Sequence, residues 1–202
     1  MRIIFGTYNP TKLETMRERL QGLDIDMIGL SDLEVNCAEP EETGKHPIEN
    51  ARLKAISYNK QLNETVLSTD VGLYFDNVEE ADQPGVYIKR IHGQDLKYEE
   101  LQDYYITLVK KYGGQLTAYY KSATCIVFGP SEIYELEHIS EKFYLVDKPH
   151  VNYKEGFPLD SISVDIATGK YYYDIEEDNG VDILTLKLRK FIKDILQIKL
   201  KV

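Results

Sequence analysis

Three polar residues that could bind a ligand, Thr7, Asn9 and Lys12, lie between an apolar run and a helical pattern. A strand that enters a polar turn and then a helix can bind an anion, because the first backbone N–H groups of the helix point outward there. Each residue also has a structural interpretation, since Thr and Asn cap helices and an exposed Lys is usually solvated. The spacing therefore indicates either a phosphate-binding turn or an ordinary helix start.

Carboxylates are the second feature that could do chemistry. Glutamates are frequent in the polar loop of residues 39–42, and Asp70 ends the apolar pattern of residues 66–70. Mg²⁺ in proteins uses one or two carboxylates together with phosphate oxygens and water, and ligands collect at the carboxyl ends of strands in open α/β sheets. The structural alternatives are a solvated loop and a turn-forming Asp before Gly72. The pattern predicts a metal site only if these carboxylates meet.

Alternating strands and helices must position these side chains. Asn9 and Pro10 are typical of an N-cap and a first helical residue, and Pro47 is typical of another helix start. The expected strands are residues 2–6, 27–30, 66–70 and several within 116–175, and the expected helices are those that begin at Pro10 and Pro47 and those over 96–112 and 182–198. This order predicts an α/β fold with a mixed sheet, in a single domain over residues 1–202.

The composition is that of a folded protein with 202 residues, 43% of them hydrophobic, and a net charge of −10. This charge argues against a nucleic-acid partner, because binding through phosphates needs clustered Lys and Arg. Phosphate chemistry would need a local basic pocket, a divalent cation or both. Cys37 and Cys125 match no disulfide or metal pattern and should behave as small apolar residues. With no apolar run near the ~20 residues of a membrane span and no signal-like start, we expect a cytoplasmic protein without membrane partners.

Several motifs occur in a fixed order along the chain. They are Thr7-x-Asn9-x-x-Lys12, Glu42, Glu49-Asn50-Ala51-x-x-Lys54-Ala55, Thr69-Asp70-x-Gly72-Leu73 and Pro84-Gly85-Val86-Tyr87. Their combination resembles the inosine triphosphate pyrophosphatase family, whose members remove non-standard purine nucleotides such as dITP and XTP. A weaker likeness lies at residues 156–160, and the match near the C-terminus is poor.

The resemblance implies an elongated mixed β-sheet flanked by helices, with two lobes and a central cleft, and a homodimer. It implies hydrolysis of a nucleoside triphosphate to a nucleoside monophosphate and pyrophosphate, with Mg²⁺ as the cofactor. Asp70 would be the catalytic base and would hold the metal together with Glu42. The substrate-binding residues that it implies are Thr7, Asn9, Lys12, Lys54, Val71, Lys89, Phe157 and Asp160.

The sequence departs from the family in two places. Thr69 and Val71 stand where the family carries Asp and Ser, which removes one charge and one hydroxyl. The family's Lys and Ser-His-Arg, which read the purine oxygen, align with Asp178 and residues 182–184. A site without those donors leaves the oxygen unpaired, so we expect an altered base preference. Two alternatives stay open: a nucleotide-binding protein with weakened catalysis on the same scaffold, and a hydrolase of another phosphorylated metabolite.

Overall fold

A computed structural model gives the fold and describes residues 1–91, 93–152, 157–175 and 182–200. Its α-helices are α1 (Pro10–Arg19), α2 (Pro47–Leu62), α3 (Tyr98–Lys111) and α4 (Ile183–Lys199). Its strands are β1 (Arg2–Phe5), β2 (Asp26–Gly29), β3 (Val66–Phe75), β4 (Arg90–Ile91), β5 (Gln94–Asp95), β6 (Gln115–Gly129), β7 (Glu132–Ile139), β8 (Phe143–Val146) and β9 (Ser163–Asp165). No helix within the described ranges combines the length and the apolar character needed to cross a membrane.

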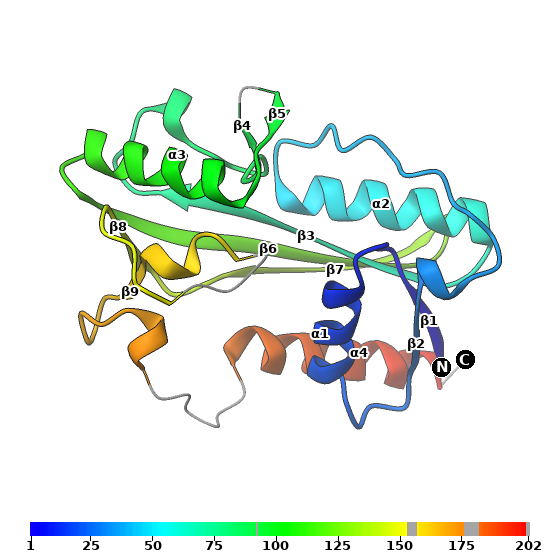
Figure 1. The fold of residues 1–202 in the computed structure, drawn as a ribbon. Coiled ribbons are helices and arrows are strands. Elements are labelled where there is room, and N and C mark those ends of the chain that lie inside the picture. The colour runs from blue at the N-terminus through cyan, green and yellow to red at the C-terminus, as the bar shows by residue number, and fades with distance from the viewer. Residues whose placement is uncertain (92, 153–156, 176–181, 201–202) are drawn as a thin grey trace. The chain divides into compact units, whose positions relative to one another are not determined.

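Seven of these strands form one mixed sheet in the order β2-β1-β3-β6-β8-β9, with β7 paired to β6 (Figure 1). Strand β1 pairs in parallel with both β2 and β3, and β8 pairs antiparallel with both β6 and β9. Parallel neighbours need long connections, and α1 and α2 lie in the connections between β1, β2 and β3. The predicted α/β class with a mixed sheet is confirmed.

The described chain divides into two compact units. The first comprises Met1–Asp70, Ser122–His138 and Gly180–Val202, and the second comprises Val71–Lys121 and Ile139–Asn179. Strands β3 and β6 each contribute residues to both units. Residues 71–75 could continue the strand that reaches Asp70 or turn out of it, and in the structure they continue it to Phe75.

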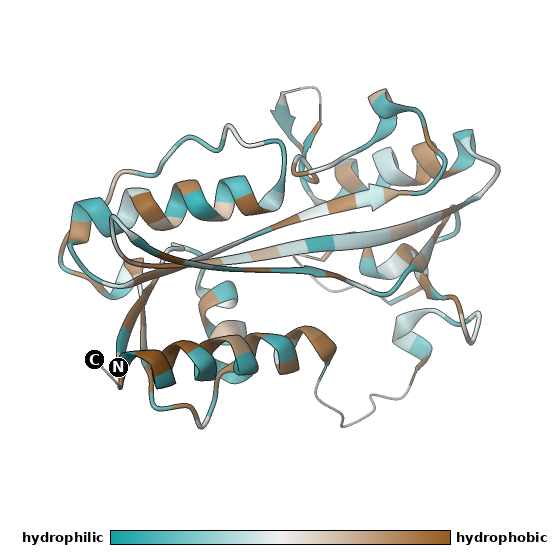
Figure 2. Ribbon diagram, turned by 180° about the vertical axis from the view of Figure 1, so that it is seen from behind, coloured by the Kyte–Doolittle hydropathy of each residue, from teal (hydrophilic) through white to brown (hydrophobic). Residues whose placement is uncertain are grey.

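In the first unit, helices cover both faces of β1 and β3. Ile3 and Phe5 pack in one cluster with residues of α1 and α4, whereas Ile4 packs in another with Ala51 and Ala55 of α2. This alternation follows from the two-residue period of a strand. Figure 1 shows α2 on one side of these strands and α1 and α4 on the other, and Figure 2 shows the mixed hydrophobic and hydrophilic residues along α4. The first unit therefore has β1 and β3 packed between helices on both faces.

The second unit is built around α3. Buried residues of this helix, such as Leu101 and Tyr105, pack with Leu73, Phe143 and Leu145 of the strands. The helix begins at Tyr98 rather than at the predicted residue 96, because Lys97 is its N-cap and the Lys97 N–H donates a hydrogen bond to the Glu100 carboxylate at 2.9 Å. It ends before two glycines whose φ angles are both +91°, a conformation that favours glycine.

Candidate active site

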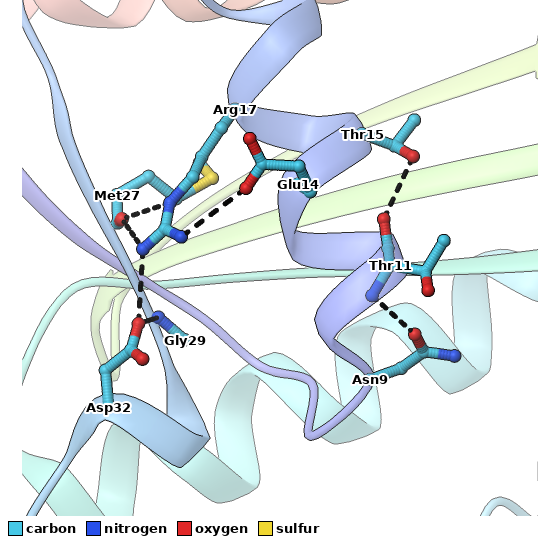
Figure 3. A network of polar contacts seen from close by, with 8 residues as sticks. All are labelled: Asn9, Thr11, Glu14, Thr15, Arg17, Met27, Gly29 and Asp32. Atoms are coloured by element: carbon cyan, nitrogen blue, oxygen red, sulfur yellow. Dashed lines mark hydrogen bonds and ion pairs between the residues drawn. The ribbon is translucent and has the colours of Figure 1, made fainter.

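The polar turn after β1 starts α1 in the way that the sequence predicts. Asn9 is the N-cap, and its Oδ1 accepts hydrogen bonds from the N–H groups of Thr11 at 2.9 Å and Lys12 at 3.2 Å. Figure 3 shows the first of these bonds. Thr7 Oγ1 accepts a bond from the Asn9 N–H at 3.1 Å. The turn is thus held by its own side chains.

This capping overturns one expectation from the sequence. Backbone N–H groups of the first helical turn were expected to point outward and bind phosphate, but the Asn9 oxygen takes those of Thr11 and Lys12, and Pro10 has none. The donors that Thr7, Asn9 and Lys12 can present are therefore side-chain groups: a hydroxyl, an amide and an ammonium. Phosphate binding here would depend on residue types rather than on the helix end.

A pocket of about 220 Å³ opens at this turn. It is lined by Gly6, Thr7, Tyr8, Asn9, Lys12, Glu39, Pro40, Glu42, Lys54, Tyr58 and Thr69, all from the first unit. Pockets for drug-sized ligands usually have about 300–1,000 Å³, so this one suits a small polar part of a ligand, such as a phosphate chain. The structure thus brings together most of the predicted residues of the first unit.

Asp70 lies beside this pocket, in contact with Lys54. The Lys54 Nζ is 3.0 Å from Asp70 Oδ1 and 2.9 Å from Glu42 Oε1. The side chains of Asp70 and Lys54 are only 10% and 11% exposed, whereas that of Glu42 is 45% exposed. The two predicted metal ligands therefore converge on one ammonium group.

Asn50 is a site residue to which sequence reasoning assigned no role. Its Nδ2 donates to Asp70 Oδ2 at 3.2 Å, and its Oδ1 accepts from the Gly44 N–H at 2.8 Å. The Gly44 donor fixes the amide orientation, because only the oxygen of Asn50 can accept it. Asn50 and Lys54 are four positions apart on α2 and so share a helix face. This spacing is the signal that could have predicted a joint role.

Burial shifts the pKa of Asp70. Loss of solvent raises the pKa of this carboxyl above its ordinary value, and the neighbouring Lys54 ammonium offsets only part of that effect. A buried carboxylate of this kind is stabilised when a cation lies against it. The Asp70 environment therefore favours binding of positive charge.

The donor set fits Mg²⁺. Glu42 and Asp70 supply carboxylate oxygens that converge within hydrogen-bond distance of one atom, the Lys54 Nζ. Among the described residues no group of three or more His, Cys, Asp or Glu side chains is arranged to hold a metal. Two carboxylates are nevertheless what Mg²⁺ commonly takes from a protein when phosphates and water complete its shell. The metal roles of Glu42 and Asp70 stay predictions.

Gly6 allows a close approach at the floor of the pocket. A Cβ at this position would lie 2.2 Å from Ser68 Oγ and 2.9 Å from Tyr58 Cδ2. The Ser68 hydroxyl is buried and has no hydrogen-bond partner among the residues that the structure describes. A side chain at position 6 would therefore force the Ser68 or Tyr58 side chain to shift.

The other predicted binding residues belong to the second unit. Val71 lies on β3 and is 38% exposed, and Lys89 is exposed just before β4. Phe157 is 41% exposed, and its carbonyl accepts the Asp160 N–H at 3.3 Å, where a short 3₁₀ turn begins. Their substrate-binding roles stay predictions.

The segment that aligns with the family's base-reading residues has a structural use. Asp182 is the N-cap of α4: it accepts bonds from the Thr185 N–H at 2.9 Å and the Thr185 hydroxyl at 2.6 Å. Residues 183 and 184 form the first turn of that helix, and Asp178 lies outside the described residues. The carboxylate at position 182 is therefore engaged by its own helix.

Comparison with known proteins identifies relatives of this chain. The Ham1 family pattern matches residues 3–162. A dITP/XTP pyrophosphatase of Caldanaerobacter subterraneus subsp. tengcongensis is 28% identical over 95% of this chain and 96% of that protein, and one of Bacillus subtilis is 30% identical over 80% and 79%. A HAM1 protein from Coxiella burnetii and the Staphylococcus aureus Ham1 protein share the fold, with TM-scores of 0.71 and 0.68 at 20% and 23% identity, over 100% of this chain and 98% of theirs.

These matches confirm the resemblance that the motif order predicted, and they extend over the segments that hold the pocket, Glu42, Lys54 and Asp70. The two solved structures support the fold alone, since their sequence identities are low. The chain belongs to the Ham1 family.

Proposed function

We propose that this chain hydrolyses a non-standard purine nucleoside triphosphate to the nucleoside monophosphate and pyrophosphate, with Mg²⁺ as cofactor. Membership of the Ham1 family makes it a nucleoside triphosphate pyrophosphatase, and its relatives from Caldanaerobacter and Bacillus are named dITP/XTP pyrophosphatases. The observation that carries the proposal is the convergence of Glu42 and Asp70 on Lys54, beside a pocket lined by the turn of residues 7–12.

In this proposal the residues of the turn and Lys54 bind the phosphates. Thr7 and Asn9 donate neutral hydrogen bonds, and Lys12 and Lys54 supply positive charge. Such positioning and charge neutralisation are most of what phosphoryl-type transfer requires of a protein. Bound Mg²⁺ would add neutralisation of the phosphate oxygens.

Asp70 accepts the proton of the attacking water. The water oxygen bonds to the α-phosphorus while the bond from that phosphorus to the oxygen bridging the α- and β-phosphates breaks. Pyrophosphate then leaves. Asp70 is suited to this because burial raises its pKa toward the working pH, which strengthens it as a base. The Asn50 amide, bonded to Asp70 Oδ2 at 3.2 Å, leaves the carboxylate one fixed orientation.

An assay of pyrophosphate release tests the proposal. Purified protein with Mg²⁺ would be given a panel of standard and non-standard nucleoside triphosphates, including dITP and XTP. Asp70→Asn should lose turnover. Asp32→Asn is the matched control, because Asp32 also accepts bonds from a cation and an N–H group, Arg17 at 3.2 Å and Gly29 at 3.0 Å (Figure 3), away from the pocket. No release from any nucleotide, or near-normal turnover in Asp70→Asn, would contradict the proposal.

One observation favours a second function, nucleotide binding with weakened catalysis. Thr69 lines the pocket with a hydroxyl where the family resemblance predicts a carboxylate. In that case a triphosphate would raise the melting temperature without being hydrolysed.

A homodimer in the cytoplasm is also proposed from the resemblance, and light scattering of the purified protein would test the dimer.

A further inference from the structure

One positively charged group lies between the two carboxylates proposed to hold the metal. Lys54 Nζ is 2.9 Å from Glu42 Oε1 and 3.0 Å from Asp70 Oδ1. These are the distances of charge-assisted hydrogen bonds. The ammonium therefore occupies one oxygen of each carboxylate that is proposed to hold the cation.

Lys54 and a divalent cation cannot both occupy this position. Mg²⁺ requires its ligand oxygens at about 2.0–2.1 Å in near-octahedral geometry, so a cation bound to both carboxylates would lie within a few ångströms of Nζ. The repulsion of a double by a single positive charge is twice that of two single charges at the same separation. The Lys54 and Asp70 side chains are 11% and 10% exposed, so this repulsion is screened less beside Asp70 than beside Glu42, which is 45% exposed.

A bound triphosphate would offer the Lys54 ammonium other partners in the pocket. The Lys54 side chain lines the pocket together with Thr7, Asn9 and Lys12. The backbone of α2 is held by the buried Ala51 and Ala55, so only the flexible four-carbon stem has to move. Phosphate oxygens in the pocket are negatively charged, as the carboxylates are, and would replace them as hydrogen-bond acceptors for the Lys54 ammonium.

We propose that Lys54 competes with the divalent cation for Glu42 and Asp70, and that the triphosphate ends this competition by drawing the Lys54 ammonium onto its phosphates. This inference rests on the proposed function. It makes the binding of metal and triphosphate mutually favourable through a residue of the protein, and such coupling is reciprocal. The protein alone would then bind the cation weakly.

The test measures Mn²⁺ binding to the full chain without nucleotide, by calorimetry and by the electron paramagnetic resonance signal of unbound Mn²⁺. Lys54→Met replaces the ammonium with an unbranched neutral side chain. We expect about tenfold tighter Mn²⁺ binding than in the wild-type chain, within the usual range of such couplings, together with weaker binding of a non-hydrolysable triphosphate in EDTA.

Lys12→Met is the matched control, because Lys12 lines the same pocket. It should weaken triphosphate binding and change the Mn²⁺ affinity much less than Lys54→Met does. Lys54→Gln is measured alongside, in case Lys54→Met does not fold. Mn²⁺ affinity at or below the wild-type value in the folded Lys54 variants overturns the inference. Pyrophosphate release by the wild-type chain, assayed in parallel, then shows whether the proposed function stands without it.

Discussion

Replacing Asn50 by Leu tests whether this residue positions the catalytic carboxylate. Asn50 is buried, with 1% of its surface exposed, and joins Gly44 to Asp70. Gly44 lies in the loop that also carries Glu42, so the amide sets the distance between the two carboxylates. Leu is close to Asn in size but makes neither hydrogen bond. The substitution should therefore change both stability and catalysis.

The structure gives the size of the stability effect. Asn50→Leu leaves the buried Gly44 N–H without an acceptor and takes one donor from Asp70. A buried polar group that loses its partner costs about 1–3 kcal/mol, and Asp70 keeps Lys54 as a second donor. We expect the free energy of unfolding to fall by about 2–4 kcal/mol, on the basis of this range for the N–H and a smaller term for the carboxylate.

Asn59→Leu is the control for this loss of stability. Asn59 lies on the same helix, is 8% exposed, and donates to the carbonyl of Glu64 at 2.7 Å and that of Val127 at 3.4 Å. It does not line the pocket. Its removal should lower stability to a similar degree without affecting the Asp70 carboxylate.

Urea unfolding and pyrophosphate release, both at 25 °C, measure the two effects. Only Asn50→Leu should lower kcat, by about tenfold or more, since a catalytic group displaced by about 1 Å can cost a hundredfold. It should also raise the Mg²⁺ concentration that gives half-maximal activity. Equal kcat and equal Mg²⁺ dependence in the two variants would refute the positioning role.

Three further predictions concern the rest of the chain. Gly6→Ala should lower the free energy of unfolding by about 1–3 kcal/mol, because the new Cβ would lie 2.2 Å from Ser68 Oγ; a double-mutant cycle with Ser68→Ala should recover part of this loss, and strict additivity would contradict it. A hydrogen bond from Lys111 holds the pKa of Asp82 below its ordinary value, so this carboxylate stabilises the fold above the unfolded value of about 3.9 and the effect is lost as the pH falls through the lower folded value. Asp82→Asn should accordingly lower the melting temperature at pH 7 and not at pH 2, and an equal loss at both would count against this account. Burial raises the pKa of Cys125 to about 12, so mass spectrometry should find it unmodified by iodoacetamide at pH 8 until urea unfolds the chain, whereas rapid labelling of the folded protein would contradict its burial.

Local features of the chain were predictable from the sequence. Asn9 and Pro10 start α1 and Pro47 starts α2, as predicted, because a helix start depends on residues adjacent in the chain. The mixed α/β sheet followed from the order of apolar runs and helical patterns, which report the faces that each element must bury. Both cysteines are buried and unpaired, as their number and spacing indicated.

The contacts between these residues depend on the tertiary structure. Lys54 and Asp70 are sixteen positions apart in the sequence. They meet because β3 pairs with β1 in a fixed register and α2 packs against these strands. The periodicity within a single helix or strand does not predict that arrangement. For the same reason the sequence assigned no role to Asn50, whose partners lie in a loop and on a strand. The expectation that the first N–H groups of α1 point outward was wrong, because the Asn9 side chain accepts hydrogen bonds from those of Thr11 and Lys12. Residue types thus determined which chemistry is available, and long-range packing determined which charges meet.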